Sequence, residues 1–239
     1  MPGRINLERT VPVDRYWSSD QGLTALLASI ALLTFVFLPL EASGLISPAW
    51  FFLVDVWVAG VLLAGASALG WHRVQRGVLV ALLAILMVVL ALRLLARGLP
   101  ATWSEALASG ISALVFSVLT GLILARVFQN GPVTRHRIFG AVAIYLLLGL
   151  IWAEAYRLLD ALSPGSIEGA QLRTGEGSLF PFVYFSLTTL TTAGFGDILP
   201  VSLPARSLAS LESMTGMLFP AVLIARLVAM SLVNTPKDP

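Results

Sequence analysis

The sequence predicts an all-α membrane protein with six transmembrane helices and one short re-entrant segment. Hydrophobic residues make up 57% of the 239 residues, and charged residues make up only 12%. That charged share is about half of what a soluble domain carries. The apolar residues occur in long runs rather than in amphipathic stripes, as they do in helices that cross a membrane. Together these observations exclude an ordinary soluble domain.

Six apolar stretches are long enough to cross a hydrocarbon core of about 30 Å. Short breaks separate the first five, and the clearest turn signal among them is Asn130-Gly131-Pro132. The gap before the last stretch is longer and holds an apolar piece at 179–190, which is too short to span and is expected to be re-entrant. The predicted spans are 22–40, 49–70, 77–97, 104–127, 138–160 and 203–233.

The basic residues predict the orientation of these spans. If six helices alternate in direction, three arginine clusters fall on one side of the membrane, and basic loops face the cytoplasm. We therefore expect a multi-pass protein of the cell (cytoplasmic) membrane with both termini cytoplasmic and a cytoplasmic segment at 1–21. The arginines on this side are Arg4, Arg9, Arg15, Arg73, Arg76, Arg126, Arg135 and Arg137.

Composition also excludes several kinds of chemistry. The chain has no cysteine, so it forms no disulfide and offers no thiolate for catalysis or for a metal. Neither His72 nor His136 has a partner at metal-ligand spacing, and a net charge of +2 does not suggest a nucleic-acid partner. No nucleophile–base pair or phosphate-binding loop is present, so the sequence predicts neither an enzyme nor a cofactor.

One polar segment interrupts the apolar pattern, the stretch SLTTLTTAGFGDILP at 186–200. In the predicted topology it enters the membrane from the outside and returns to the same side. Non-helical backbone at that depth must be buried by protein or line a water-filled path. Gly194 and Gly196 permit backbone torsions that other residues resist. Such torsions can turn successive carbonyls toward one axis, where a ring of oxygens replaces the hydration shell of a monovalent cation. One chain supplies one edge of the ring, so several chains must surround the axis.

The residues Thr192-Ala193-Gly194-Phe195-Gly196-Asp197 closely resemble the T-V-G-Y-G signature of potassium channel filters, followed by aspartate. The resemblance covers 138–233 as outer helix, pore helix (179–190), filter (191–197) and inner helix. It implies that K⁺ binds the carbonyls of Thr192, Ala193, Gly194 and Phe195 and the Thr192 hydroxyl, with Gly196 at the outer mouth. Ala193 replaces valine and Phe195 replaces tyrosine, which leaves a nonselective pore open as an alternative.

Several residues are expected to support this filter. The pore helix resembles one whose carbonyl end faces a cavity and favours a cation. Glu212 lies inside an apolar helix, where an ionisable group needs a partner. We expect it to be protonated or hydrogen-bonded to the back of the pore helix near Thr188 or Thr189, and so to brace the filter. The expected supporting residues are Thr188, Thr191, Asp197 and Glu212.

The last predicted helix carries the candidate gating residues. Gly216 lies 19 residues after Asp197, about where similar channels carry a hinge glycine, although close helix packing explains a small residue equally well. Pro220 removes a backbone donor and is expected to kink the helix. Candidates for the cavity wall and inner gate are Met217, Ile224 and Val228.

The segment 22–130 resembles the four-helix domain that accompanies the pore in voltage-gated channels, with 131–239 as the pore domain. A voltage sensor needs several basic residues on one helix, and the fourth span has only Arg126. We therefore expect weak voltage dependence. Asp55 and Arg93 fall at similar depth and are interpreted as a structural ion pair, with an ion or proton path as the alternative. No regulatory domain is evident.

Together these patterns predict a homotetrameric, potassium-selective channel that conducts K⁺ passively and has membrane lipids as its surroundings. A nonselective monovalent cation channel is the main alternative. A potassium transporter is a second, although such proteins repeat the loop four times in one chain and this sequence has it once. A nonconducting membrane scaffold is the third.

Overall fold

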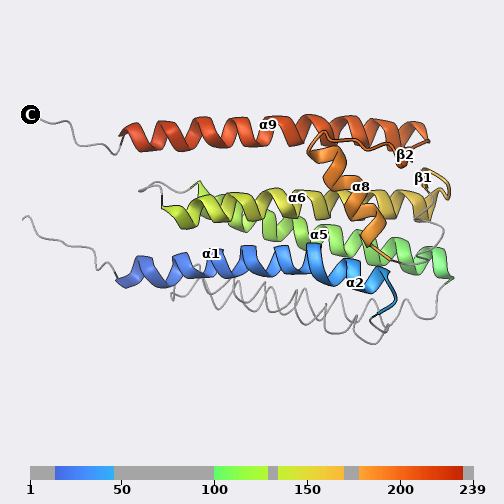
Figure 1. Ribbon diagram of the computed structural model, residues 1–239, viewed down its shortest axis with the longest axis horizontal. Helices are drawn as coiled ribbons and strands as arrows, with labels where there is room; N and C mark the ends of the chain where they lie inside the picture. The colour runs from blue at the N-terminus through green and yellow to red at the C-terminus, as the bar shows by residue number, and fades with distance from the viewer. Residues whose placement is uncertain (1–13, 46–99, 129–133, 170–177, 234–239) are drawn as a thin grey trace, which may run out of the picture.

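The computed structural model describes residues 14–45, 100–128, 134–169 and 178–233. In Figure 1 the long helices lie side by side along one axis, and the short helix α8 crosses obliquely between α6 and α9. The helices are α1 (Asp14–Leu32), η1 (Leu33–Phe37), α2 (Leu38–Ala42), α5 (Ala101–Val127), α6 (Arg135–Leu162), α8 (Phe180–Leu190) and α9 (Leu203–Val233). Two short strands, β1 (Ile167–Gly169) and β2 (Ile198–Pro200), accompany them.

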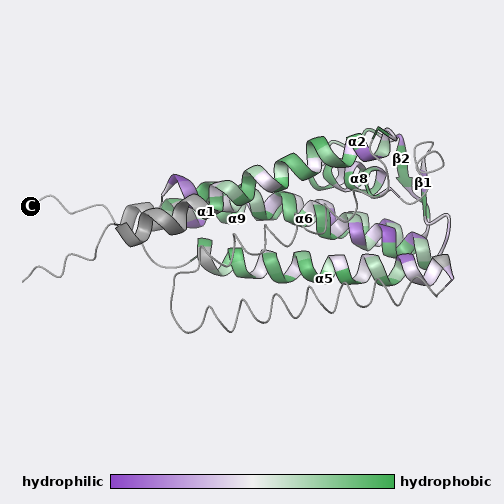
Figure 2. Ribbon diagram, turned by 90° about the horizontal axis from the view of Figure 1, so that it is seen from below, coloured by the Kyte–Doolittle hydropathy of each residue, from purple (hydrophilic) through white to green (hydrophobic). Residues whose placement is uncertain are grey.

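Four helices in the described part of the chain are long and apolar enough to cross a membrane: Leu23–Ala42, Thr102–Ala125, Arg135–Leu162 and Leu203–Arg226. They confirm four of the six predicted spans. The predicted spans at 49–70 and 77–97, with Asp55 and Arg93, lie outside the described residues. The hydropathy colouring in Figure 2 shows apolar residues along most of the length of α5 and α6.

The helix that contains the first predicted span begins before that span, because helical structure runs from Asp14 to Ala42. A five-residue π-helix, η1, interrupts it just before Pro39. Proline lacks an amide hydrogen and its ring crowds the carbonyl four residues earlier, so the regular hydrogen-bond ladder cannot continue there. A π-type turn absorbs this local mismatch without ending the helix.

Helix α6 is the centre of the bundle, since α1, α5, α8 and α9 all pack against it. Its residues Leu147, Leu150 and Ala153 are almost completely buried. Glycines allow the close approach of neighbouring helices: a Cβ added at Gly149 would lie 2.7 Å from a methyl group of Leu187 in α8. The pore-helix candidate α8 is therefore held against the most buried of the described long helices.

A small antiparallel sheet joins the end of α6 to the segment that follows residue 197. Ile167 pairs with Pro200, and the Val201 amide donates to the Ser166 carbonyl at 2.9 Å. The Asp160 carboxylate accepts the amides of Gly165 and Ser166, both at 3.1 Å, which fixes the turn between α6 and β1. These strands were not expected from the sequence.

Helix α9 makes a very close contact with the end of α8 at Gly216. A Cβ added there would lie 1.8 Å from the carbonyl oxygen of Leu190, so no other residue fits without moving the helices apart. Gly216 therefore serves close helix packing, the second of its two expected roles.

We expect Gly216→Ala to lower the free energy of unfolding by about 1–3 kcal/mol, the usual range for overpacking. Gly121 in α5 is the matched control, because a Cβ there meets nothing within 4 Å. Alanine is the better helix former, so Gly121→Ala is expected to be neutral or stabilising by up to about 1 kcal/mol. Thermal unfolding of the purified proteins compares them, and equal melting temperatures would contradict the proposed contact.

Candidate functional site

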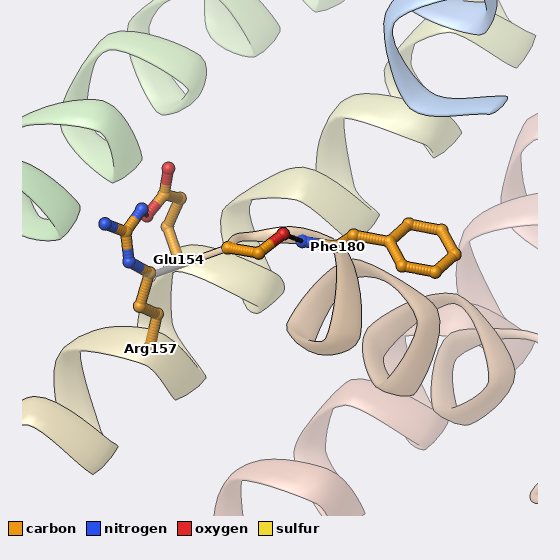
Figure 3. Close-up of polar contacts among 4 residues, drawn as sticks. Glu154, Arg157 and Phe180 are labelled. Carbon is orange, nitrogen blue, oxygen red and sulfur yellow. Dashed lines mark hydrogen bonds and ion pairs between the residues drawn. The ribbon is translucent and has the colours of Figure 1, made fainter. Parts of the chain in front are cut away.

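The candidate site is built on the short helix α8, and a side-chain hydrogen bond holds the first turn of this helix. The Ser178 hydroxyl accepts a hydrogen bond from the Phe180 amide at 3.2 Å, shown by the dashed line in Figure 3. Figure 3 also shows Arg157 beside Glu154 on α6, and their charged groups lie 4.0 Å apart. Pro181 occupies the first turn, where its missing amide hydrogen does no harm.

The carbonyl end of α8 is bound by side chains of two other helices. The last carbonyls of a helix lack partners within the helix and must find them elsewhere. The Tyr145 hydroxyl of α6 donates to the Leu190 carbonyl at 3.1 Å, and the Ser213 hydroxyl of α9 donates to the Thr189 carbonyl at 3.3 Å. The end of α8 is therefore positioned by α6 and α9 together.

The backbone after α8 alternates in handedness from residue to residue. Thr192, Gly194 and Gly196 have positive φ angles of 59°, 50° and 82°, whereas Ala193 and Phe195 between them do not. Alternation of this kind turns successive peptide groups the same way, so their carbonyls share one side. Thr192 is β-branched, and such a residue at positive φ costs about 1–3 kcal/mol and occurs mostly at functional sites.

The amides of this segment show on which side the carbonyls lie. The Thr192 amide donates to the Thr189 carbonyl at 3.0 Å, and the amides of Ala193 and Gly194 donate to the Thr188 carbonyl at 2.8 and 3.1 Å. In a trans peptide the carbonyl of one residue points opposite to the amide of the next. The carbonyls of Thr192 and Ala193 therefore point away from α8.

Each predicted supporting residue has a defined place, though not always the expected one. The Thr188 hydroxyl bonds within α8 to the Phe185 carbonyl at 2.9 Å, so Thr188 supports the loop through its backbone carbonyl. The Thr191 hydroxyl likewise donates back to the Leu187 carbonyl at 2.7 Å. Both side chains thus reinforce the end of α8.

The outer half of the loop rests on Tyr184 of α8. The rings of Tyr184 and Phe195 stack with their centroids 6.2 Å apart and an angle of 16° between them. The Asp197 carboxylate lies near the Tyr184 hydroxyl. Tyr184 thus lies against the loop and near the residue that follows it.

Glu212 is hydrogen-bonded to the pore-helix candidate α8, as expected, but at Ser186 rather than at Thr188 or Thr189. Its side chain is completely buried, with one carboxyl oxygen 2.5 Å from the Ser186 hydroxyl and the other 2.6 Å from the Tyr156 hydroxyl. Neither Ser186 nor Tyr156 was expected from the sequence as a partner. A polar residue within an apolar membrane helix needs a partner, so the rule that identified Glu212 could also have identified Ser186.

Helix α9 continues as one helix through Gly216 and Pro220 and exposes two apolar faces. At about 100° per residue, Met217, Ile224 and Val228 share one face and Leu211, Leu218 and Val222 share another. All six side chains are more than half exposed in the single chain. The hinge role of Gly216 and Pro220 and the cavity role of the first face remain predictions.

The far end of α9 is attached to the end of α5. The Arg226 guanidinium lies 4.4 Å from the centre of the Phe128 ring and donates to the Phe128 carbonyl at 3.1 Å. This contact was not expected from the sequence. It links α9, which follows the filter candidate, to the end of α5, which precedes it.

Comparison with known proteins agrees with this geometry. Residues 140–232 match a protein-family model described as Ion channel, and they include most of α6, all of α8 and the loop, and most of α9. No curated protein and no solved structure matches the chain. The chain therefore contains an ion channel domain within a multi-pass membrane protein, and such a domain is not an enzyme.

We expect Gly194→Ala to reduce cation flux strongly, because it places a side chain at a φ of +50° and so disturbs the alternation of the loop. Gly165 is a matched control at a φ of +82° in the turn after α6, and a Cβ at either glycine meets nothing within 4 Å. Both variants should lose similar stability, about 1 kcal/mol. Only Gly194→Ala should lose flux into liposomes, and unchanged flux would contradict a role for the loop in conduction.

Proposed function

We propose that the protein is a potassium-selective channel that conducts K⁺ passively across the cell membrane. One observation carries this proposal. Residues 192–196 alternate in handedness while their first amides bond to α8, which leaves a row of carbonyl oxygens directed away from that helix. Uncharged carbonyl oxygens in a row can replace the hydration shell of a monovalent cation.

The proposed K⁺ ligands are the carbonyls of Thr192, Ala193, Gly194 and Phe195, with the Thr192 hydroxyl at the inner end and Gly196 at the outer mouth. Potassium is the permeant ion, and the function needs no cofactor. Support for the first two carbonyls comes from the amide bonds to Thr188. Support for the others comes from the continued alternation at Gly194 and Gly196.

The proposed assembly is a homotetramer around the axis toward which the carbonyls point. Residues 191–197 are all exposed in the single chain, and the two apolar faces of α9 are uncovered. Four copies would bring four loops together and close the ring. The face with Met217, Ile224 and Val228 would then line the cavity and inner gate, and the face with Leu211, Leu218 and Val222 would meet a neighbouring subunit or lipid.

The proposed orientation places both termini in the cytoplasm. Figure 1 shows that α1 begins and α9 ends at the same end of the bundle, opposite α8 and the loop. The arginine clusters of the sequence support a cytoplasmic location for that end. The filter would thus open to the outside. The C-terminal half of α9, beyond Gly216 and Pro220, would form the inner gate.

A nonselective cation channel is the second candidate, and two side chains favour it. Ala193 places only a methyl group behind the carbonyls, and the Phe195 ring has no hydroxyl with which to bond the surrounding helices. A less restrained ring of oxygens would discriminate less between K⁺ and Na⁺.

Liposome flux tests the proposal. Purified protein in liposomes should carry K⁺ down its gradient, and the reversal potential in mixed K⁺ and Na⁺ should follow K⁺. Gly194→Ala serves as the inactive control. Equal permeation of the two ions would favour the nonselective channel, and the absence of any flux would favour a nonconducting scaffold.

We expect the conductance to depend only weakly on voltage. Each elementary charge that crosses the membrane field contributes about 2.3 kcal/mol per 100 mV, and steep gating needs three to four such charges in each subunit. The predicted fourth span carries a single arginine. Conductance measured against voltage in planar bilayers should give a shallow curve, and a steep sigmoid would show that gating charges lie elsewhere in the chain.

A further inference from the structure

Three helices meet at one buried polar cluster behind the loop. Glu212 of α9 contacts Ser186 of α8 and Tyr156 of α6, and Ser186 also contacts the Gly149 carbonyl of α6 at 2.7 Å. Glu212 and Ser186 are completely buried, as is Tyr156. These are short contacts in a place that water does not reach, so each needs a hydrogen atom between its two oxygens.

Counting the hydrogens determines which group donates. A carbonyl can only accept, so the Ser186 hydroxyl must use its single hydrogen on Gly149. The contact between Ser186 and Glu212 then needs a second hydrogen, and only the carboxyl group of Glu212 can supply it. The Tyr156 hydroxyl donates to the other carboxyl oxygen. With one proton on Glu212, all four contacting groups are satisfied.

An ionised Glu212 would leave this cluster incomplete. The Ser186 hydrogen would turn to the carboxylate, and the bond to Gly149 would be lost. A buried negative charge also needs a cation nearby, and among the described residues no arginine or lysine forms a salt bridge with Glu212. The titratable groups around it, Tyr145 and Tyr156, are phenols that carry no positive charge.

We propose that Glu212 is a neutral carboxylic acid that donates its proton to Ser186 and thereby positions α8 behind the filter. Ser186 lies two residues before Thr188, whose carbonyl accepts the amides of Ala193 and Gly194. Any rotation of α8 at Ser186 therefore moves the carbonyl that orients the loop. Glu212 is a positioning residue, since it acts on the loop through α8, and its effect on conduction rests on the proposed channel function.

The protonation of Glu212 can be observed directly. A protonated carboxylic acid has a C=O stretching band apart from the bands of carboxylates, so the infrared spectrum of the wild-type protein at neutral pH should contain it. Glu212→Gln should remove the band. Glu154→Gln is the matched control, because Glu154 is also buried on a membrane helix but lies beside Arg157, so its substitution should leave the band in place. Absence of the band from the wild type would overturn the proposal.

Flux separates a donated hydrogen bond from a negative charge. Glutamine has a donor and an acceptor in the same positions as a protonated glutamate, so Glu212→Gln should retain K⁺ flux and selectivity within about threefold. Glu212→Leu has a similar volume but no donor, and it should lower flux or K⁺ selectivity about tenfold or more. Ser186→Ala removes the acceptor and should resemble Glu212→Leu.

Two results would overturn the positioning role. Glutamine and leucine variants that lose flux equally would show that the charge is required, and a leucine variant with wild-type flux and selectivity would show that the cluster does not position α8. A wild-type protein without flux would instead refute the proposed function. The infrared band and the melting temperatures of the same variants would then still decide whether Glu212 is a donor that holds the three helices together.

Discussion

The structure depends on one constraint, which is that every backbone amide held at membrane depth must have a hydrogen-bond acceptor. The loop after α8 meets this constraint with the free carbonyls at the end of α8 itself, since Thr188 and Thr189 accept the amides of residues 192–194. Because a trans peptide places its carbonyl opposite its amide hydrogen, the oxygens must then face the other way. The row of oxygens proposed to bind K⁺ is thus a direct consequence of satisfying the amides. The positive φ of Thr192 is the local strain that this arrangement requires.

This arrangement requires that α8 itself be fixed, and an 11-residue helix cannot fix itself. Tyr145 and Ser213 bind its last carbonyls from two sides, and Gly216 brings the backbone of α9 directly against Leu190. The Glu212 cluster adds a polar connection one turn earlier along α8. The small residues and the buried polar residues of α6 and α9 therefore have the same purpose, which is to hold one helix end in a single orientation.

The sequence predicted the parts of the fold that depend on length and hydropathy. The boundaries of α5, α6 and α8 lie within three residues of the expected ranges 104–127, 138–160 and 179–190, because a membrane span must reach a fixed length of apolar residues. The strands β1 and β2 were not predicted, because three residues are too few to show a periodicity and because their pairing depends on where α6 and the loop end. Glu212 was expected to bond to the back of α8, and it does, but at Ser186 rather than near Thr188 or Thr189. Which residues of α8 face α9 depends on the rotation of both helices, and tertiary packing sets that rotation.

The same contacts bear on selectivity. A ring of carbonyls distinguishes K⁺ from a smaller ion only if the ring resists contraction or presents oxygens of fixed number and field strength. Phe195 has no hydroxyl with which to anchor the loop, yet its ring stacks with Tyr184 at a centroid distance of 6.2 Å, and the Tyr184 hydroxyl lies near the Asp197 carboxylate. The side chain that supports the outer loop thus belongs to α8 rather than to the loop. Since α8 is in turn held by α6 and α9, the loop can be rigid without a tyrosine at position 195, and this argument favours the potassium-selective channel over the nonselective one.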